Sequence, residues 1–219
     1  MTARKEELRA NLEQVEIKIS KVLESVGRNR DEVTLIVVTK TFPVSDAILL
    51  YDIGVRDFGE NRDEEGFTKA PLLPSDARWH FQGQVQGRKI PSISSWANTV
   101  HSLDSLSHAA KFANSHNGKA LEYFLQVNLE PDATHRGGVQ PGEISTFLQE
   151  SPVQISGLMV VAPLDSNPST SSSAFDSVRE LGFLHGLKNL SMGMSGDFEA
   201  ALTAGATHIR VGSSILGSR

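Results

Sequence analysis

The chain has 219 residues, with 26 Asp and Glu against 21 Lys and Arg, and its formal net charge of −5 argues against a nucleic-acid-binding surface. It contains no cysteine, which excludes disulfides, thiolate catalysis and zinc–thiolate sites. No segment has the length and apolarity of a signal core or a membrane span, so we expect a cytoplasmic protein that contacts neither membrane nor nucleic acid.

Residues 3–26 are predicted to form a helix that precedes the first strand. Apolar residues recur there at spacings of four and three, which places them on one helical face, namely Leu8, Leu12, Val15, Ile19, Val22 and Val26. Gly27 follows the last of them and is expected to end the helix, as a glycine past the last turn commonly does. We expect this helix to cap or flank the rest of the fold.

After this helix, short apolar or β-branched runs alternate with helical stretches. The expected strands are residues 35–40, 55–61, 78–83, 99–104, 123–128, 155–162, 190–195 and 208–213. The expected helices include residues 44–51, 105–115, 142–149, 173–182 and 197–204. Strand–helix–strand alternation implies parallel strands joined by helical crossovers, and eight repeats imply a closed (β/α)₈ barrel rather than an open doubly wound sheet.

A single domain is expected, with the N-terminal helix in residues 1–27 and the barrel in residues 31–219. The runs at 55–61 and 78–83 are short and polar, so their assignment as strands depends on their position in the series. The Ser-rich stretch 166–173 is expected to be a mobile loop that leads into a helix rather than an interdomain linker, because the alternation continues after it.

Lys40 ends the apolar run L-I-V-V-T-K, and a Thr-Phe-Pro turn follows it directly. A lysine whose stem is packed in a barrel interior has a poorly solvated amine, which makes it a better nucleophile. No other lysine of the chain ends so clear a buried-strand pattern. The structural alternative is that Lys40 only marks the point where the strand leaves the core.

A second candidate feature lies in the loops after the seventh and eighth strands, which read M-S-G-D and R-V-G-S-S. In (β/α)₈ barrels the active face is the C-terminal end of the strands, and phosphate commonly binds in these two loops. We expect Ser195 and Gly196 to open a helix with outward amides, Gly212 to allow close backbone approach, and Ser213 to supply donors. Each segment alone is an ordinary N-cap or turn, but together they favour a phosphate cup.

A reactive amine on the first strand and a phosphate cup on the last two are neighbours in a closed barrel. This combination suits pyridoxal 5′-phosphate (PLP), whose aldehyde would condense with Lys40 and whose phosphate would dock at Ser195, Gly212 and Ser213. Arg210 shares a strand face with Gly212, since residues two apart point the same way, and is expected to reach the pyridine nitrogen. An arginine there keeps that nitrogen unprotonated and weakens the cofactor as an electron sink.

The motifs of the chain appear in a familiar order: V-V-T-K-T-F, F-G-E-N, W-H-F-Q-G-Q-V-Q, H-S-L-D, L-Q-V-N, G-L-M-V-V, L-S-M-G-M-S and H-I-R-V-G-S-S-I-L-G. From about residue 31 to the C-terminus they resemble the pyridoxal phosphate homeostasis protein family, which has an alanine-racemase-like N-terminal barrel and no second domain. The resemblance implies a PLP carrier or regulator without established catalysis. It also implies PLP-dependent apoenzymes as partners, and we expect a monomer.

The resemblance implies roles for individual residues. Lys40 would condense with PLP, Arg210 would face the ring nitrogen, and Ser195, Gly212 and Ser213 would hold the phosphate; Asn61 and His80 would line the cavity, and Met159 would contact the ring or its rim. For His80, between Trp79 and Phe81, the alternative is a satisfied core histidine. The chain departs from the family pattern at Val38 and Thr39 in the first motif, at Arg62 and at Arg88. These departures put in doubt a role for the loop after the third strand.

Three functions stay open on the sequence. The first is the carrier, and the second is a PLP-dependent amino-acid racemase, which needs two bases on opposite faces of the cofactor. Lys40 is one candidate base, but Tyr51 and Tyr123 are expected far from the strand ends. The third is a Schiff-base aldolase acting on a phosphorylated substrate. The seven histidines show no spacing typical of a metal site, so no metal is expected.

Overall fold

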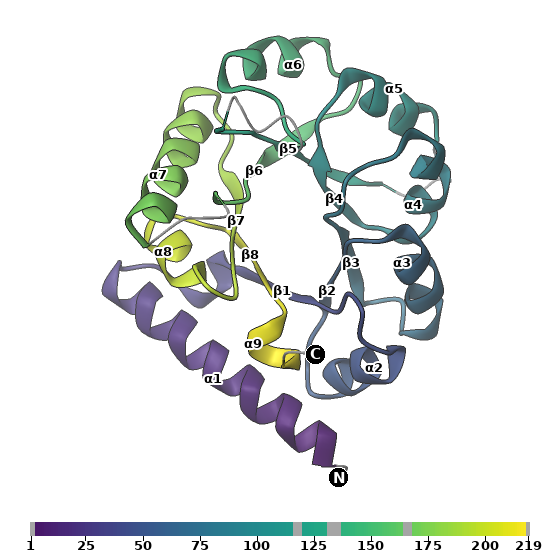
Figure 1. The fold of residues 1–219 in the computed structure, drawn as a ribbon, viewed down its shortest axis with the longest axis vertical. Helices are drawn as coiled ribbons and strands as arrows, with labels where there is room; N and C mark the ends of the chain where they lie inside the picture. The colour runs from purple at the N-terminus through teal and green to yellow at the C-terminus, as the bar shows by residue number, and fades with distance from the viewer. Residues whose placement is uncertain (1–2, 116–119, 131–136, 164–167, 218–219) are drawn as a thin grey trace.

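The computed structural model describes residues 3–115, 120–130, 137–163 and 168–217. These residues form a closed barrel of parallel strands surrounded by helices (Figure 1). The strands follow one another around the barrel in chain order from β1 to β8, and β8 pairs with β1 to close it. The predicted (β/α)₈ barrel is therefore confirmed. None of the helices in these ranges is long and apolar enough to cross a bilayer.

The elements alternate along the chain as expected. The strands are β1 Thr34–Val38, β2 Asp57–Glu60, β3 Arg78–Phe81, β4 Thr99–Leu103, β5 Glu122–Gln126, β6 Ile155–Met159, β7 Asn189–Met194 and β8 His208–Val211. The α-helices are α1 Ala3–Ser25, α2 Val44–Asp52, α3 Asp63–Lys69, α4 Ile90–Trp96, α5 Leu106–Asn114, α6 Ile144–Glu150, α7 Pro168–Leu184, α8 Phe198–Thr203 and α9 Ser213–Leu216. Short 3₁₀ turns are η1 Arg30–Glu32, η2 Ala70–Leu72, η3 Gly87–Lys89 and η4 Pro141–Glu143.

One expectation about local structure needs correction. The short helices α3, α4 and α9 add to the helical stretches named from the sequence and complete the alternation. The Ser-rich stretch 166–173 is helical from Pro168 onward, where a loop was expected, and residues 164–167 lie outside the described ranges. Proline suits this position because its fixed φ is already helical and the first turn needs no amide from it.

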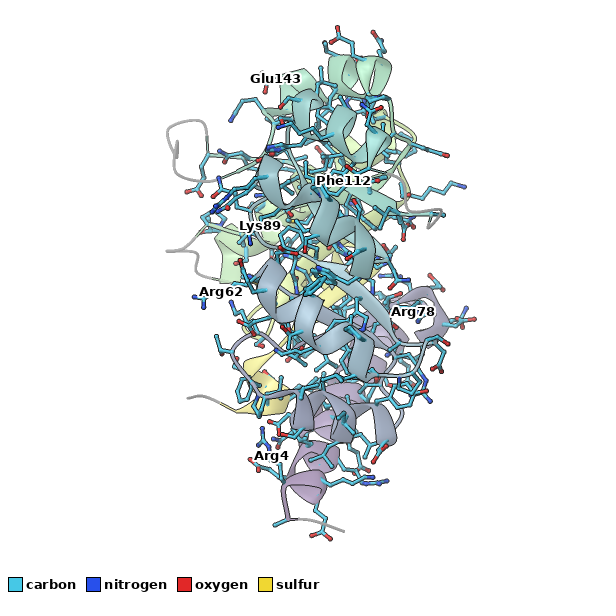
Figure 2. The ribbon with its side chains drawn as sticks, turned by 90° about the vertical axis from the view of Figure 1, so that its right-hand side faces the viewer. Arg4, Arg62, Arg78, Lys89, Phe112 and Glu143 are labelled. Carbon is cyan, nitrogen blue, oxygen red and sulfur yellow. The ribbon has the colours of Figure 1, made fainter. Side chains whose placement is uncertain are left out.

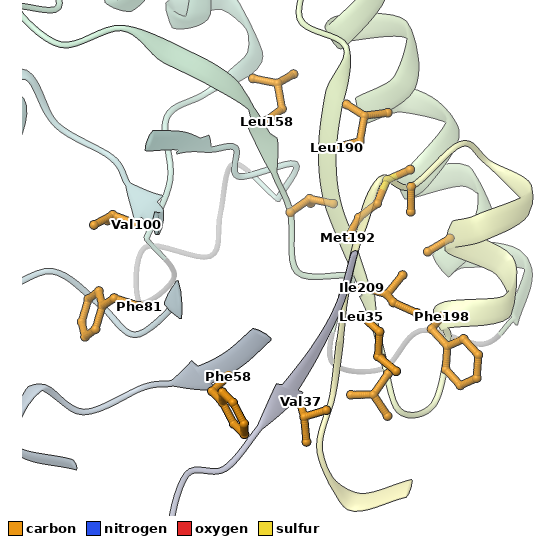
Figure 3. Close-up of a cluster of buried hydrophobic side chains, with 14 of the residues drawn as sticks. Leu35, Val37, Phe58, Phe81, Val100, Leu158, Leu190, Met192, Phe198 and Ile209 are labelled. Carbon is orange, nitrogen blue, oxygen red and sulfur yellow. The ribbon is translucent and has the colours of Figure 1, made fainter. Parts of the chain in front are cut away.

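The outer face of the barrel wall is apolar and packs against the helices (Figure 3). Phe58 on β2 stacks on Trp79 of β3 with ring centroids 5.2 Å apart, and Trp79 meets Trp96 of α4 edge to face at 6.5 Å. Gly66 brings α3 against the same ring, since a Cβ there would lie 2.3 Å from a Trp96 ring carbon. Aromatic packing thus joins the two short polar strands to the helices around them, which confirms their assignment as strands.

The N-terminal helix α1 flanks the barrel, where it lies beside α8 and α9 and reaches α2 (Figure 1). Its buried residues are Leu8, Val15, Ile19 and Leu23. Arg4 donates to the Asp46 carboxylate of α2 at 2.7 Å and to the Leu216 carbonyl of α9 at 3.0 Å. Asn11 donates to the Ile215 carbonyl at 2.9 Å. The helix therefore holds in place the short α9 that follows the expected phosphate loop.

Candidate functional site

Lys40 lies at the C-terminal rim of the barrel, but its side chain is not packed in the interior. Strand β1 ends at Val38, two residues earlier than expected, and Thr39 is the last fully buried residue of this segment. Lys40 itself is exposed. The expectation of a desolvated stem is therefore wrong, because the chain leaves the wall before it reaches Lys40. The buried lysine near this rim is Lys69, whose side chain is 7% exposed and pairs with Glu60.

The loop expected to hold phosphate lies beside the strand that carries Lys40. Strands β1 and β8 pair in parallel, and a Cβ on Gly212 would lie 3.2 Å from the Val38 carbonyl oxygen. A Cβ at this position would therefore require the two segments to shift by a few tenths of an ångström. The Gly212 amide donates to the Ser195 hydroxyl at 3.1 Å, which ties the loop after β7 to the loop after β8.

The helix that follows Ser195 begins later than expected. Helix α8 starts at Phe198 with Asp197 as its N-cap residue, so that Ser195 and Gly196 lie in the turn before it. After β8, Ser213 opens the short helix α9, and the first amides of a helix have no intrahelical acceptor. Ser195, Gly196, Gly212 and Ser213 are thus brought together as predicted, although the outward amides come from a turn and from the start of α9.

Arg210 is almost fully buried in the barrel, with 4% of its surface exposed. Its guanidinium donates to the Ser191 hydroxyl at 2.8 Å and to the Val160 carbonyl at 2.9 Å. Burial lowers the pKa of Arg210 to about 10. Among the residues that the structure describes, no carboxylate forms an ion pair with it. A buried cation with neutral hydrogen-bond partners and no carboxylate beside it favours an electron-rich ligand nearby.

A row of hydrogen bonds crosses the barrel interior from Arg210 to the opposite end, and we call it the interior row. It runs from Ser191 to His101 at 2.8 Å, from His101 to His80 at 2.9 Å, and from His80 to Asp57 at 3.0 Å. Asp57 accepts from Arg78 at the N-terminal end of the barrel. Burial raises the pKa of Asp57, but the hydrogen bonds from Arg78 and His80 outweigh it and lower the pKa to about 2.

With both histidines neutral, one proton assignment satisfies the whole interior row. Arg210 can only donate, so Ser191 accepts from it and donates its own proton to His101 Nδ1. His101 Nε2–H then donates to His80 Nδ1, and His80 Nε2–H donates to the Asp57 carboxylate. Burial lowers the pKa of His101 well below its usual value, and the neighbouring His80 adds to this effect. The row therefore orients Arg210 through Ser191.

This arrangement bears on the predicted role of His80. The residue is 3% exposed, and both of its ring nitrogens are engaged within the protein. The structure favours the core role over a place on the cavity wall. The sequence around His80 could not reveal this core role, because its hydrogen-bond partners His101 and Asp57 come from other strands.

Asn61 and Gln82 stand at the C-terminal ends of β2 and β3 with unused polar atoms. Asn61 Oδ1 and Gln82 Nε2 are buried, and neither has a hydrogen-bond partner in the described part of the chain. The Gln82 amide packs over Gly59, where a Cβ would come within 2.2 Å of it. Gln82 was not predicted as a site residue, although its position two residues after His80 places it on the inward strand face. Met159 ends β6 and is 2% exposed.

The two arginines that depart from the family pattern line one groove at this rim. Arg62 and Arg88 border a groove of about 270 Å³ together with Asn61, Gln86 and Lys89. Figure 2 shows Arg62 and Lys89 at one end of the barrel and Arg78 at the other. The loop after β3 is therefore basic and lies next to Asn61, and Arg88 donates only to Gln86, at 3.3 Å, among its described contacts. No group of three potential metal ligands occurs within the described ranges.

Comparisons with known proteins agree with this fold. Residues 10–219 match the family described as alanine racemase, N-terminal domain. A protein from Mycobacterium tuberculosis named pyridoxal phosphate homeostasis protein is 34% identical, covering 99% of this chain and 94% of its own. A Bifidobacterium adolescentis crystal structure superposes with a TM-score of 0.90 at 26% identity, covering 98% of this chain and 96% of that one.

A solved structure with its ligand adds to these similarities. PipY from Synechococcus elongatus, solved with PLP bound, is 34% identical with a TM-score of 0.77, covering 91% of this chain and 100% of its own. The matches extend over nearly the whole length of both this chain and its relatives. The chain therefore belongs to the alanine racemase N-terminal domain family and, within it, to the pyridoxal phosphate homeostasis proteins.

Proposed function

We propose that this protein binds PLP at the C-terminal mouth of its barrel and acts in intracellular PLP homeostasis as a carrier or regulator. The observation that carries the proposal is the contact between Gly212 and Val38. It sets the phosphate loop beside the segment that ends in the exposed amine of Lys40. The name of the Mycobacterium tuberculosis relative and the PLP bound to PipY support the same function.

The residues present at the mouth fit the groups of PLP. When bound, PLP supplies an aldehyde that condenses with a primary amine and releases water, together with a phosphate dianion and a pyridine nitrogen. Lys40 provides the amine; Ser195, Gly196, Gly212 and Ser213 bind the phosphate, and Arg210 faces the ring nitrogen. The unpartnered amide atoms of Asn61 and Gln82 offer one acceptor and one donor for polar groups on the ring. Met159 contributes an apolar wall.

The racemase alternative is less well supported because neither tyrosine of the chain is placed to act as its second base. The Tyr51 hydroxyl donates to Asp76 at 2.5 Å, on the outer surface of the barrel. Tyr123 is 5% exposed, packs edge to face on Phe112 of α5, and burial raises its pKa to about 12. Neither hydroxyl is placed to move a proton opposite Lys40. Incubation with single L-amino acids followed by chiral analysis tests this: sustained formation of the D-isomer would contradict the carrier function.

Absorption spectroscopy with PLP tests the binding proposal. We expect purified protein to develop a visible band with PLP, and borohydride to fix the added mass covalently. Lys40→Ala should abolish both effects while changing the free energy of unfolding by less than about 0.5 kcal/mol, because Lys40 is exposed. Lys188→Ala, another exposed lysine, is the control and should behave as the unmodified protein. Protein that takes up no PLP would refute the proposal, and a phosphorylated aldehyde or ketone consumed without a lasting band would favour the aldolase.

The expectations of a cytoplasmic monomer that serves PLP-dependent apoenzymes remain predictions. Light scattering after gel filtration should give the mass of one chain. The PLP-loaded protein should restore an apoenzyme quickly when the two are mixed, and slowly when a membrane that passes free PLP but retains protein separates them. Reactivation at the same rate in both arrangements would show simple release instead.

A further inference from the structure

The two peptide groups on either side of Lys40 are both held by helix α3. The Thr39 carbonyl accepts from the Lys69 ammonium at 2.9 Å, and the Thr41 amide donates to Glu65 Oε2 at 2.7 Å. The first group belongs to the peptide that enters Lys40 and the second to the peptide that leaves it. Because peptide units are planar, holding both restricts the two soft backbone dihedrals of Lys40. An exposed side chain therefore projects from a constrained backbone.

The Lys69 ammonium connects these contacts into one cluster. It binds Glu60 Oε1 at 2.7 Å and Glu65 Oε2 at 3.0 Å in addition to the Thr39 carbonyl, so its three N–H donors all have acceptors. Glu60 Oε1 also accepts from the Thr39 hydroxyl at 2.6 Å. The cluster of Lys69, Glu60 and Glu65 therefore contacts the chain before Lys40 twice and after it once. We call these three residues the brace.

The turn that the brace holds is a strained one. Thr41 has φ of 67°, and it is the only residue other than glycine with a positive φ in the described ranges. A β-branched side chain rarely adopts this conformation, and such residues persist only where their surroundings impose them. The bond from the Thr41 amide to Glu65 and the bond from the Phe42 amide to the Thr39 carbonyl, at 3.1 Å, impose it here.

We propose that Lys69, Glu60 and Glu65 are positioning residues that fix the backbone of Lys40, so that its amine meets an aldehyde ligand without further ordering of the chain. The inference deepens the proposed function, on which it rests. Ordering a loop before binding removes an entropic cost that would otherwise weaken the affinity. The ligand class is a phosphorylated aldehyde, since the amine and the phosphate loop lie on paired strands.

A contribution to the stability of the fold does not by itself explain why the three brace residues are charged. Glu60 is fully buried, and its Oε2 has no hydrogen-bond partner in the described part of the chain. Desolvation raises the pKa of Glu60 even though Lys69 and Thr39 oppose this effect. Apolar residues of similar size commonly serve stability as well as a buried ion pair does. An incompletely satisfied charge cluster at this position is better explained by its hold on the segment around Lys40.

Neighbouring residues provide matched variants for the test. Glu65→Met removes the acceptor for the Thr41 amide, and Glu65→Gln keeps a carbonyl oxygen there and should restore an intermediate value. Glu64→Met alters the adjacent position, which pairs with Lys89 at the surface. Lys69→Met removes the central cation of the brace, and Lys89→Met removes a lysine that bridges Asp63 and Glu64 without contacting the segment around Lys40.

Two measurements separate positioning from structural support. The first is hydrogen exchange of the Thr41 amide without ligand, followed by NMR. The second is the affinity for PLP compared with pyridoxamine 5′-phosphate, which carries the same phosphate and ring but cannot condense with an amine. In Glu65→Met we expect exchange at Thr41 to accelerate and PLP affinity to fall about tenfold, as loss of a charged hydrogen bond suggests. Pyridoxamine 5′-phosphate affinity should stay within about twofold, and Glu64→Met should change neither value.

The outcomes that overturn the inference are distinct from failure of the proposed function. Equal losses of affinity for both ligands in Glu65→Met would make the brace merely structural, and no loss for either would make it irrelevant. If Lys69→Met does not fold, the Glu65 series still decides the question, since Glu65 lies at the surface end of the cluster with its side chain 21% exposed. Unmodified protein that binds no PLP refutes the proposed function, whereas an unprotected Thr41 amide in that same protein refutes the brace.

Discussion

The inner and outer faces of the barrel wall differ in chemistry although the same strands form both. On the outer face, Phe58 and Trp79 stack in a shell of apolar side chains. On the inner face, their neighbours Asp57 and His80 join through a hydrogen bond in the interior row. Successive strand residues point to opposite sides, so both arrangements fit one backbone.

This difference separates what holds the barrel together from what equips it for binding. Apolar burial outside the strands supplies stability in proportion to the area removed from water. Inside, buried polar groups contribute little net stability when satisfied and are costly when they lose a partner. Arg210 is the inner residue that we propose to face the ligand. Its neighbours in the interior row set its orientation. Substitutions on the outer and inner faces should therefore change the free energy of unfolding to different extents.

Removal of a large outer side chain should have the largest effect on stability. Phe58 is fully buried, and Phe58→Ala should lower the free energy of unfolding by about 3–5 kcal/mol, because the cavity left between β2, β3 and α4 can close only in part. Denaturant titration measures this change. Phe183→Ala is the control, since Phe183 is 91% exposed and its loss should cost less than about 0.5 kcal/mol. Similar values for the two variants would show that the outer shell does not dominate stability.

Removing the charge of Asp57, at the far end of the interior row, should lower the free energy of unfolding by a smaller amount. Asp57→Asn retains an acceptor for His80 but removes the charge that binds Arg78, and we expect a loss of about 2 kcal/mol. Asp76→Asn is the matched control, because it interrupts an exposed Asp–Arg pair with Arg56 and should be nearly neutral. If Asp57→Asn were as harmless as the control, the interior row would contribute nothing measurable to folding.

Acidification should sharpen the same comparison, because burial on the inner face opposes the charging of its histidines in the folded chain. Burial lowers the pKa of His101 well below its usual value and that of His208 to about 4, with neighbouring His80 adding to both effects. The unfolded chain therefore takes up more protons as the pH falls below 6.5. We expect each histidine to lower the free energy of unfolding by about 1 kcal/mol between pH 6.5 and 5.5.

Denaturant titrations at several pH values measure this effect. His208→Gln should remove about half of the loss, because one of the two histidines no longer titrates. A free energy of unfolding that stays constant over this range would mean that the buried histidines take up protons in the folded chain as readily as in the unfolded one.

Much of the fold could be predicted because its signals are local. Strands β2 and β3 were placed by their position in the series, and two of their polar residues, Asp57 and His80, prove to face inward and bond to each other. Part of the site's placement could be predicted as well: Gly212 bonds to Ser195, and Lys40 follows the strand that pairs with β8. Gln82 was missed although it follows the inward alternation, because a glutamine at a strand end carries no distinctive pattern.

Long-range contacts could not be predicted in the same way. The partners in the interior row come from five strands, and His101 bonds to Ser191, which lies 90 positions further along the chain. The buried lysine was assigned to the wrong residue for the same reason: Lys69 ends a polar helix, and only its approach to Thr39, 30 positions away, buries it. A sequence pattern reports periodicity and turn residues, not which distant groups meet.

The sequence by itself determined the number and order of the strands and the family, since periodicity and short motifs depend on neighbouring positions. The tertiary structure alone decided that Lys40 is exposed, that Lys69 is buried behind it, and that His80 is engaged inside the barrel. Burial and hydrogen-bond partners are decided when the barrel closes, because they depend on side chains from strands and helices that meet only when β8 pairs with β1.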